Sequence, residues 1–133
     1  MRAVTTRVAA IAVSLLASTV FPDAATAGQS EDSVTFTRDV LPIFQRSCQQ
    51  CHRPGTGAPM SLLTYEETRP WARGIRDRVV ARQMPPWHID RSIGQYIADP
   101  SLSDDEIATI VAWVEAGAPR GNPADAPSPL DLA

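Results

Sequence analysis

The pentapeptide Cys48-Gln49-Gln50-Cys51-His52 contains both cysteines of the 133-residue sequence and one of its two histidines. The two thiols stand three positions apart, so both fall on one turn of chain, and the histidine follows the second thiol directly. The length of the chain limits it to one domain at most. A chemical site is therefore expected at these five residues.

Three kinds of site use two cysteines at this spacing. A structural zinc site needs four ligands, and this chain has no second cysteine pair and only His88 as a further histidine. A thioredoxin-like redox pair follows a strand in a βαβ pattern, whereas the residues before Cys48 have helical periodicity. Covalent haem attachment remains: Cys48 and Cys51 would add to the two porphyrin vinyl groups, and His52 would be the proximal iron ligand.

Helical signals surround the pentapeptide, and no alternating β pattern of useful length is present, so we expect an all-α fold. Phe36, Val40, Phe44 and Cys48 recur every four residues and form one helix face that leads into the site. Thr37 is the predicted N-cap of this helix.

Two further helices are indicated downstream. Thr64 with Glu67 and Ser103 with Glu106 have the spacing of capping boxes. The first of these helices is predicted to start at Pro70 and to have an apolar face of Trp71, Ile75 and Val79. The second is predicted to end at Gly117 and Pro119 and to have a buried face formed by Ile107, Ile110, Val111 and Val114.

The N-terminus has the pattern of an export signal. Arg2 and Arg7 flank the start of an apolar run at 8–20, and Ala25-Thr26-Ala27 offers a cleavage site. The run is shorter than the roughly 20 apolar residues of a membrane span. We expect residues 1–27 to be a signal peptide and the mature protein to be periplasmic or secreted, not membrane-spanning; an uncleaved anchor is the alternative.

Composition divides the remaining chain. We expect a flexible N-terminus at 28–34, one domain at 35–120 and, from its Pro, Ala and Asp content, a disordered tail at 121–133. A domain of this size is marginal alone, and a haem would add apolar surface for its helices to bury. The net charge of −3 argues weakly against nucleic acid as a partner.

These features together resemble the small class I cytochrome c domain over about Thr35 to Ala118. In that family an N-terminal helix runs into CxxCH, a Met-Pro pair supplies the distal iron ligand, and a C-terminal helix closes over the first. Met84-Pro85 match the pair. Phe44 and Trp113 match the aromatic residues through which the family crosses its terminal helices.

More narrowly, Ala58-Pro59-Met60-Ser61 and Met84-Pro85-Pro86-Trp87 look like a bacterial subgroup of cytochrome domains, sometimes joined to or encoded near copper monooxygenase-like or other oxidoreductase modules. The chain departs from the general family in its long stretch from Pro86 to Leu102, in the short loop after the attachment site, and in the Trp87-His88 that follows two prolines.

The resemblance implies Met84 as the sixth iron ligand opposite His52. Met60 and His88 are alternatives; Met60 follows His52 by only eight residues, so it would reach round the porphyrin edge without slack, and packing or a haem-edge contact is expected instead. A proximal histidine usually donates its other ring N–H to a backbone carbonyl. The resemblance places that carbonyl in the following loop, and Pro54 is the predicted residue.

The segment at 69–82 holds five arginines and a single acid, Asp77. It is either a docking patch for an acidic redox partner, or a counter-charge for haem propionates, or a solvated face that pairs with nearby acids. The solvated face is the commoner case.

The resemblance implies a non-enzymatic monohaem protein with one haem c, which carries single electrons between redox proteins of the bacterial cell envelope as a monomer or within a redox complex. The alternative is a haem-bearing subunit that feeds electrons to an oxidoreductase, for example a copper monooxygenase-like partner. No set of acid and base residues for catalysis accompanies the predicted distal side.

Overall fold

The computed structural model describes residues 33–87, 89–90 and 92–132. Every regular element in those ranges is helical, with no strand, so the predicted all-α fold is confirmed there. The predicted signal peptide and His88 lie outside the described residues. The elements are η1 (Phe36–Val40), α1 (Leu41–Ser47), α2 (Tyr65–Thr68), η2 (Arg69–Trp71), α3 (Ala72–Val80), α4 (Asp104–Glu115) and η3 (Pro123–Asp125).

The helix that leads to the pentapeptide begins earlier than predicted. Thr35 stands at the N-cap of η1, and its backbone N–H donates to Asp39 Oδ2 at 2.6 Å. Thr37, the predicted N-cap, is buried within η1, and its hydroxyl donates to the carbonyl oxygen of Arg120 at 3.1 Å. Pro42 lies at the junction where η1 passes into α1, in the first turn of α1.

Both predicted capping boxes are present. Thr64 Oγ1 accepts from the backbone N–H of Glu67, and Ser103 Oγ accepts from that of Glu106, each at 3.2 Å. The two glutamate side chains accept in return from the N-cap backbone at 3.0 and 2.8 Å. These contacts satisfy N–H groups that the first turn of a helix leaves without partners.

Gly117 ends α4, as predicted. Its φ of +88° is a left-handed conformation that glycine adopts without steric cost. The Gly117 N–H donates to Val114 O at 3.1 Å, and the Ala118 N–H donates to Trp113 O at 2.8 Å. This pair of contacts is a Schellman motif, which turns the chain away from the helix axis.

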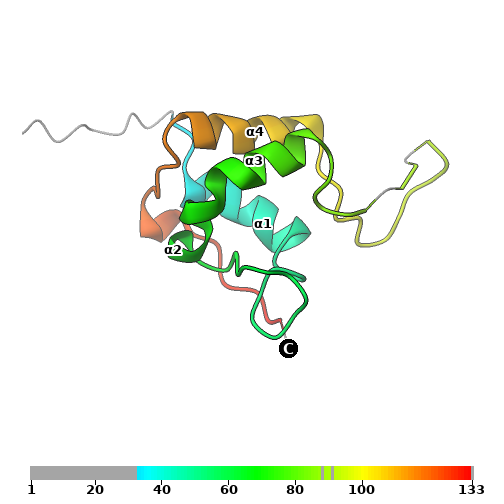
Figure 1. Ribbon diagram of the computed structural model, residues 1–133, viewed down its shortest axis with the longest axis horizontal. Helices are drawn as coiled ribbons and strands as arrows, with labels where there is room; N and C mark the ends of the chain where they lie inside the picture. The colour runs from blue at the N-terminus through cyan, green and yellow to red at the C-terminus, as the bar shows by residue number, and fades with distance from the viewer. Residues whose placement is uncertain (1–32, 88, 91, 133) are drawn as a thin grey trace, which may run out of the picture.

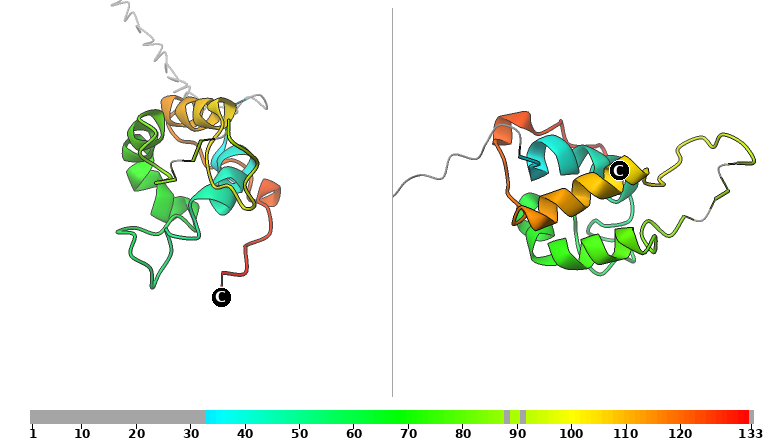
Figure 2. Two further views of the ribbon diagram at one scale, coloured as in Figure 1. Left: turned by 90° about the vertical axis from the view of Figure 1, so that its right-hand side faces the viewer. Right: turned by 90° about the horizontal axis from the view of Figure 1, so that it is seen from above.

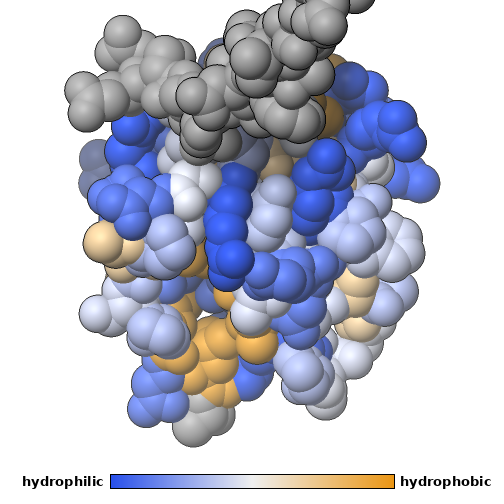
Figure 3. All heavy atoms as spheres, turned by 90° about the vertical axis from the view of Figure 1, so that its left-hand side faces the viewer, coloured by the Kyte–Doolittle hydropathy of each residue, from blue (hydrophilic) through white to orange (hydrophobic). Residues whose placement is uncertain are grey.

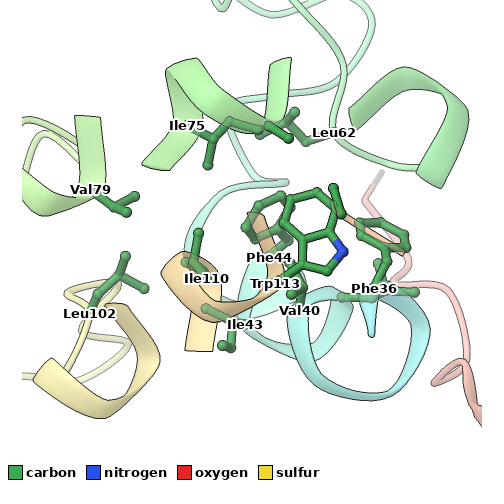
Figure 4. Packing of buried hydrophobic residues seen from close by; sticks show 13 residues of the cluster. Phe36, Val40, Ile43, Phe44, Leu62, Ile75, Val79, Leu102, Ile110 and Trp113 are labelled. Carbon is green, nitrogen blue, oxygen red and sulfur yellow. The ribbon is translucent and has the colours of Figure 1, made fainter. Parts of the chain in front are cut away.

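An aromatic cluster forms the centre of the core (Figure 4). Phe44 and Trp113, the predicted crossing pair, are both fully buried. The Phe36 ring lies between 5 and 7 Å from each, with centroids 6.3 Å from Phe44 and 5.9 Å from Trp113. The Trp113 indole N–H donates to Pro119 O at 2.9 Å, so its burial leaves no unpaired donor.

The buried helix faces differ slightly from the predicted ones. Trp71 is 48% exposed, because it ends η2 ahead of the α3 face that it was predicted to begin. The residues that line the core from α3 are Ala72, Ile75 and Val79, and those from α4 are Ile110 and Trp113, with Ile107 and Val114 partly buried against them.

Helix α3 packs against α4, and η1 packs against α1 (Figure 1). Helix α4 also lies against η1, which joins the two pairs. The described parts of the α3–α4 connection, residues 81–87, 89–90 and 92–103, extend away from the helices in Figure 1 and in the right-hand view of Figure 2. It leaves the body at the C-terminal end of α3 and returns at the N-terminal end of α4. This end of the molecule therefore holds loops where the other end holds packed aromatic rings.

The C-terminal tail differs from the prediction of disorder. After η3 it runs back along α1 toward the loop that follows the pentapeptide (Figure 1). Gln45 Nε2 donates to Ser128 O at 2.8 Å, and the Arg53 guanidinium donates to Leu132 O. Prolines reduce the backbone donors that the tail must satisfy, and side chains from α1 and the loop bind its carbonyl groups.

None of the helices in the described ranges is both long and apolar enough to cross a membrane. Hydrophilic residues cover most of the face in Figure 3, and apolar residues gather in a patch near its lower edge. Most apolar side chains of the helices thus point into the shared core.

Candidate functional site

The pentapeptide forms a tight turn directly after α1. The Cys51 N–H donates to Cys48 O at 3.1 Å, and the His52 N–H donates to the same carbonyl at 2.9 Å. Cys48 is half-buried against the core, whereas Cys51 is exposed. The structure therefore brings both thiols and the imidazole onto one turn, with one sulfur facing the core and the other facing outward.

Burial raises the pKa of the Cys48 thiol to about 12, with the nearby Arg46 charge acting in the opposite direction. The free Cys48 side chain is therefore an uncharged thiol at neutral pH. Within the described ranges, no group of three or more His, Cys, Asp or Glu residues is arranged to hold a metal ion.

The imidazole of His52 is held by the loop that follows it, at a different carbonyl from the predicted one. His52 Nδ1 lies 3.2 Å from Met60 O, so Met60 and not Pro54 supplies the backbone oxygen. The loop is brought back to the histidine by the Leu62 N–H, which donates to His52 O at 3.0 Å, and by the buried Gln49 amide, which donates to Leu62 O at 2.9 Å.

This contact decides which ring nitrogen is available. When Nδ1–H donates to the Met60 carbonyl, Nε2 carries a lone pair that can bind a metal. The Met60 side chain itself packs partly buried against the core.

Met84 is placed by the end of α3. Arg82 has a φ of +52°, and the N–H groups of Gln83 and Met84 both donate to Arg78 O, at 2.9 and 3.3 Å. This arrangement stops the helix and turns the chain, and the cis Met84–Pro85 bond follows. Met84 is 40% exposed, with its side chain on the wall of a cavity.

That cavity has a volume of about 580 Å³, within the range of roughly 300–1,000 Å³ typical of cofactor sites. Figure 4 shows Val79 and Leu102, two of its lining residues, at the end of the core cluster opposite Phe36. The lining comes from the end of α3, the α3–α4 connection and the start of α4: Val79, Arg82, Met84, Pro85, Trp87, Ile89, Asp90, Ser101, Leu102 and Ile107.

The pentapeptide does not line the cavity itself, but the first turn of α4 borders both. Ile107 is part of the cavity wall, and the adjacent Glu106 binds Arg46, two residues before Cys48, at 2.6 Å. Arg46 thus connects the helix that leads to the pentapeptide with the helix turn that borders the cavity.

The residues present fit a covalently bound haem. Two thiols on one turn suit two thioether bonds, and a histidine with Nδ1 already occupied suits a proximal ligand. The half-buried Cys48 side chain suits a bond to the edge of a porphyrin. The largely apolar residues beside Met84 suit contact with the porphyrin faces. His88, the other alternative ligand, lies outside the described residues.

The arginines of the 69–82 segment are held in different ways. Arg76 pairs with Asp77 at 2.8 Å, and Arg82 pairs with Asp104. Arg69 and Arg73 line a second cavity of about 370 Å³ near the end of α4. The ion pairs of Arg76 and Arg82 with nearby acids are typical of a solvated surface. A role of the segment in docking a redox partner stays a prediction.

One residue of the site was not predicted from the sequence. Arg46, two positions before Cys48, binds the backbone of Asp99 and Ser101 and the carboxylate of Glu106. Its partners are 53 to 60 positions away, so no local pattern points to them.

Comparisons of the chain with protein-family models, with curated proteins and with solved structures find no significant match.

Proposed function

We propose that this protein is an exported monohaem c-type cytochrome of the class I kind, which carries single electrons between redox proteins of the bacterial cell envelope. The observation that carries the proposal is the His52 imidazole, held through Nδ1 by Met60 O at 3.2 Å on the same turn as two thiols. A binding-competent Nε2 beside two cysteines is the donor set for a covalent haem and an axial iron ligand.

Attachment needs no oxidant. Each thiol of Cys48 and Cys51 adds across one vinyl group, so a carbon–sulfur bond forms and the thiol hydrogen moves to the other vinyl carbon. The product is a neutral thioether, in keeping with the buried environment that raises the pKa of the Cys48 thiol. Both cysteines are consumed, which leaves no thiol for a disulfide.

The protein's own groups hold and insulate the cofactor. His52 Nε2 is the proposed proximal ligand, and the Met84 sulfur is the proposed distal ligand. Bound haem would supply an iron that alternates between ferric and ferrous states, one electron at a time. Val79, Leu102 and Ile107 supply apolar lining to the cavity beside Met84.

A carrier role agrees with the residues at the cavity. A methionine sulfur on the iron would leave no open coordination position for a substrate. Among the described residues of the cavity wall, the carboxylate is that of Asp90, which accepts from the Ser92 N–H at 2.8 Å. We therefore propose that the protein is an electron carrier. The alternative is that it is a haem-bearing subunit that feeds electrons to an oxidoreductase.

The first test is the absorption spectrum of the full-length protein, produced in a bacterium that matures c-type cytochromes. We expect a pyridine haemochrome with one haem per chain and haem that stays on the chain in a denaturing gel. Cys48→Ser with Cys51→Ser should remove the covalent haem, while the matched variant Ser47→Ala should retain it. Wild-type protein without covalent haem would overturn the proposal.

The second test concerns the sixth ligand. Met84→Ala should abolish the weak far-red sulfur-to-iron band of the oxidised protein, and Met60→Ala should leave it in place. Loss of the band only in Met60→Ala would reverse the assignment.

A further inference from the structure

Arg46 occupies the last turn of α1, two residues before Cys48, and joins three separate parts of the chain. Its Nη1 donates to Asp99 O at 3.0 Å and to Ser101 O at 3.2 Å. Its Nη2 donates to Ser101 O at 3.2 Å and to Glu106 Oε1 at 2.6 Å. One guanidinium thus connects the attachment helix, the end of the α3–α4 connection and the first turn of α4.

The end of the connection is ordered around these contacts. Asp99 Oδ1 accepts from the Ser101 N–H at 2.8 Å, which folds the backbone into an Asx turn. This turn presents the two carbonyl groups that Arg46 binds. The next residue, Leu102, is buried, and both Ser101 and Leu102 line the 580 Å³ cavity that Met84 also lines.

A second arginine near the cavity offers a contrast. Arg82 pairs with Asp104, but their side chains are 60% and 89% exposed, and such pairs contribute little. The Arg46 and Glu106 side chains are 43% and 27% exposed, and the planar guanidinium binds three acceptor groups at once. Arg46 therefore restrains the cavity wall much more than Arg82 does.

We propose that Arg46 is a positioning residue that latches the 99–102 wall of the cavity to the attachment helix and so keeps competing ligands away from the iron beside Met84. This inference rests on the proposed haem site. The hydrogen bonds of Arg46 go to the backbone of Asp99 and Ser101 and to the Glu106 carboxylate. Its charge also acts on the Cys48 thiol, so the proposed effect on the wall is tested apart from charge.

The latch predicts a measurable rate. In the proposed haem-loaded protein, an external ligand such as imidazole would have to displace the Met84 sulfur, and an ordered 99–102 wall would hinder that exchange. Loss of the contacts from Arg46 makes opening of this wall more frequent. We expect Arg46→Gln to bind imidazole about tenfold faster than wild type, which corresponds to about 1.4 kcal/mol in the opening equilibrium.

The experiment uses the purified haem-loaded protein and follows imidazole binding by stopped-flow absorption. Arg76→Gln removes one positive charge from a pair with its neighbour Asp77, and its rate should stay within about twofold of wild type. Arg46→Lys keeps the charge but loses the fork of donors, so its rate should fall between those of wild type and Arg46→Gln.

A second readout does not depend on the iron. Hydrogen exchange of the peptide at 96–103 should speed up in Arg46→Gln and stay unchanged in Arg76→Gln. Equal imidazole rates and equal exchange in wild type and both Arg46 variants would overturn the latch. Wild-type protein without haem would instead overturn the proposed function, and the exchange experiment would still decide whether Arg46 holds the wall.

Discussion

The two ends of the molecule hold their side chains in different ways. In the packed half, formed by η1, α1 and α4, Phe36, Phe44 and Trp113 are 2% exposed or less. In the cavity half, formed by residues 84–87, 89–90 and 92–102, Trp87 is 45% exposed and Ile97 is fully exposed. The difference indicates that the packed half supplies most of the stability, while the cavity half makes few buried apolar contacts.

The largest expected effect separates two tryptophans. Trp113→Ala should reduce the free energy of unfolding by about 3–5 kcal/mol, because it empties a fully buried site. Trp87→Ala in the cavity half should cost under about 1 kcal/mol. Urea unfolding followed by circular dichroism measures both, and equal losses would show that the cavity half is packed as tightly as the other.

A pair of glycines comes next. Gly121 has a φ of +84°, and a Cβ built there would lie 2.6 Å from the side chains of Thr35 and Thr37. Gly121→Ala should therefore cost about 2 kcal/mol from backbone strain and overpacking.

Gly94 in the cavity half is the matched control, since a Cβ there meets nothing within 4 Å. Gly94→Ala should leave the unfolding free energy unchanged or raise it by up to about 1 kcal/mol, because alanine restricts the unfolded chain. Thermal unfolding of both variants measures the difference. A Gly121→Ala protein as stable as wild type would refute the close contact between the tail and η1.

A smaller effect is expected at the junction of the two halves. Ser103→Ala removes the side-chain acceptor for the Glu106 N–H and should cost about 1 kcal/mol. Ser92 bonds only within an exposed turn around Asp90, so Ser92→Ala should stay within about 0.5 kcal/mol. Chemical denaturation compares them, and a larger loss for Ser92→Ala would reverse the order.

The smallest effect concerns pH. Burial alone would raise the pKa of Asp39, but hydrogen bonds from Arg38 and Thr35 outweigh it and hold the pKa below the ordinary value of 3.8. The folded state therefore binds fewer protons than the unfolded one. The stability from ionised Asp39 is complete above the ordinary pKa and is lost as pH falls through the lowered value.

Asp39→Asn should accordingly be less stable than wild type at neutral pH and should flatten the loss of stability in acid. Asp90 in the cavity half also has a lowered pKa, from hydrogen bonds with Ser92, but it lies in an exposed turn. Urea unfolding between pH 7 and pH 3 measures how steeply the unfolding free energy falls with pH. We expect this fall to become shallower in Asp39→Asn more than in Asp90→Asn, and the opposite order would contradict the prediction.

Local patterns predicted the elements whose cause is local. The capping boxes at Thr64 and Ser103 and the helix end at Gly117 depend on residues three to five positions apart, and all three are present. The Thr37 cap was wrong because the Thr37 hydroxyl binds Arg120 O, 83 positions away. The Pro54 prediction failed similarly, since the path of the loop brings Met60 O to His52 instead.

The tail shows the limit of composition. Pro, Ala and Asp are typical of disorder, yet Gln45 and Arg53 bind carbonyl groups of the tail. Nothing within 121–132 encodes these partners, because they belong to α1 and to the loop after it.

The sequence alone was enough to predict a helical chain and the order of its donors: two thiols, a histidine and a later methionine. Periodicity and spacing predict the helices and the turn of the pentapeptide because the contacts involved are within one or two helix turns. Met84 lies far beyond that range and was predicted from the resemblance of Met84-Pro85 to the class I cytochrome c pair. Tertiary packing alone decided which carbonyl holds His52, where Met84 meets a cavity, and that Arg46 reaches the far end of the α3–α4 connection. Those contacts join residues that only the folded chain brings together, so no local pattern specifies them.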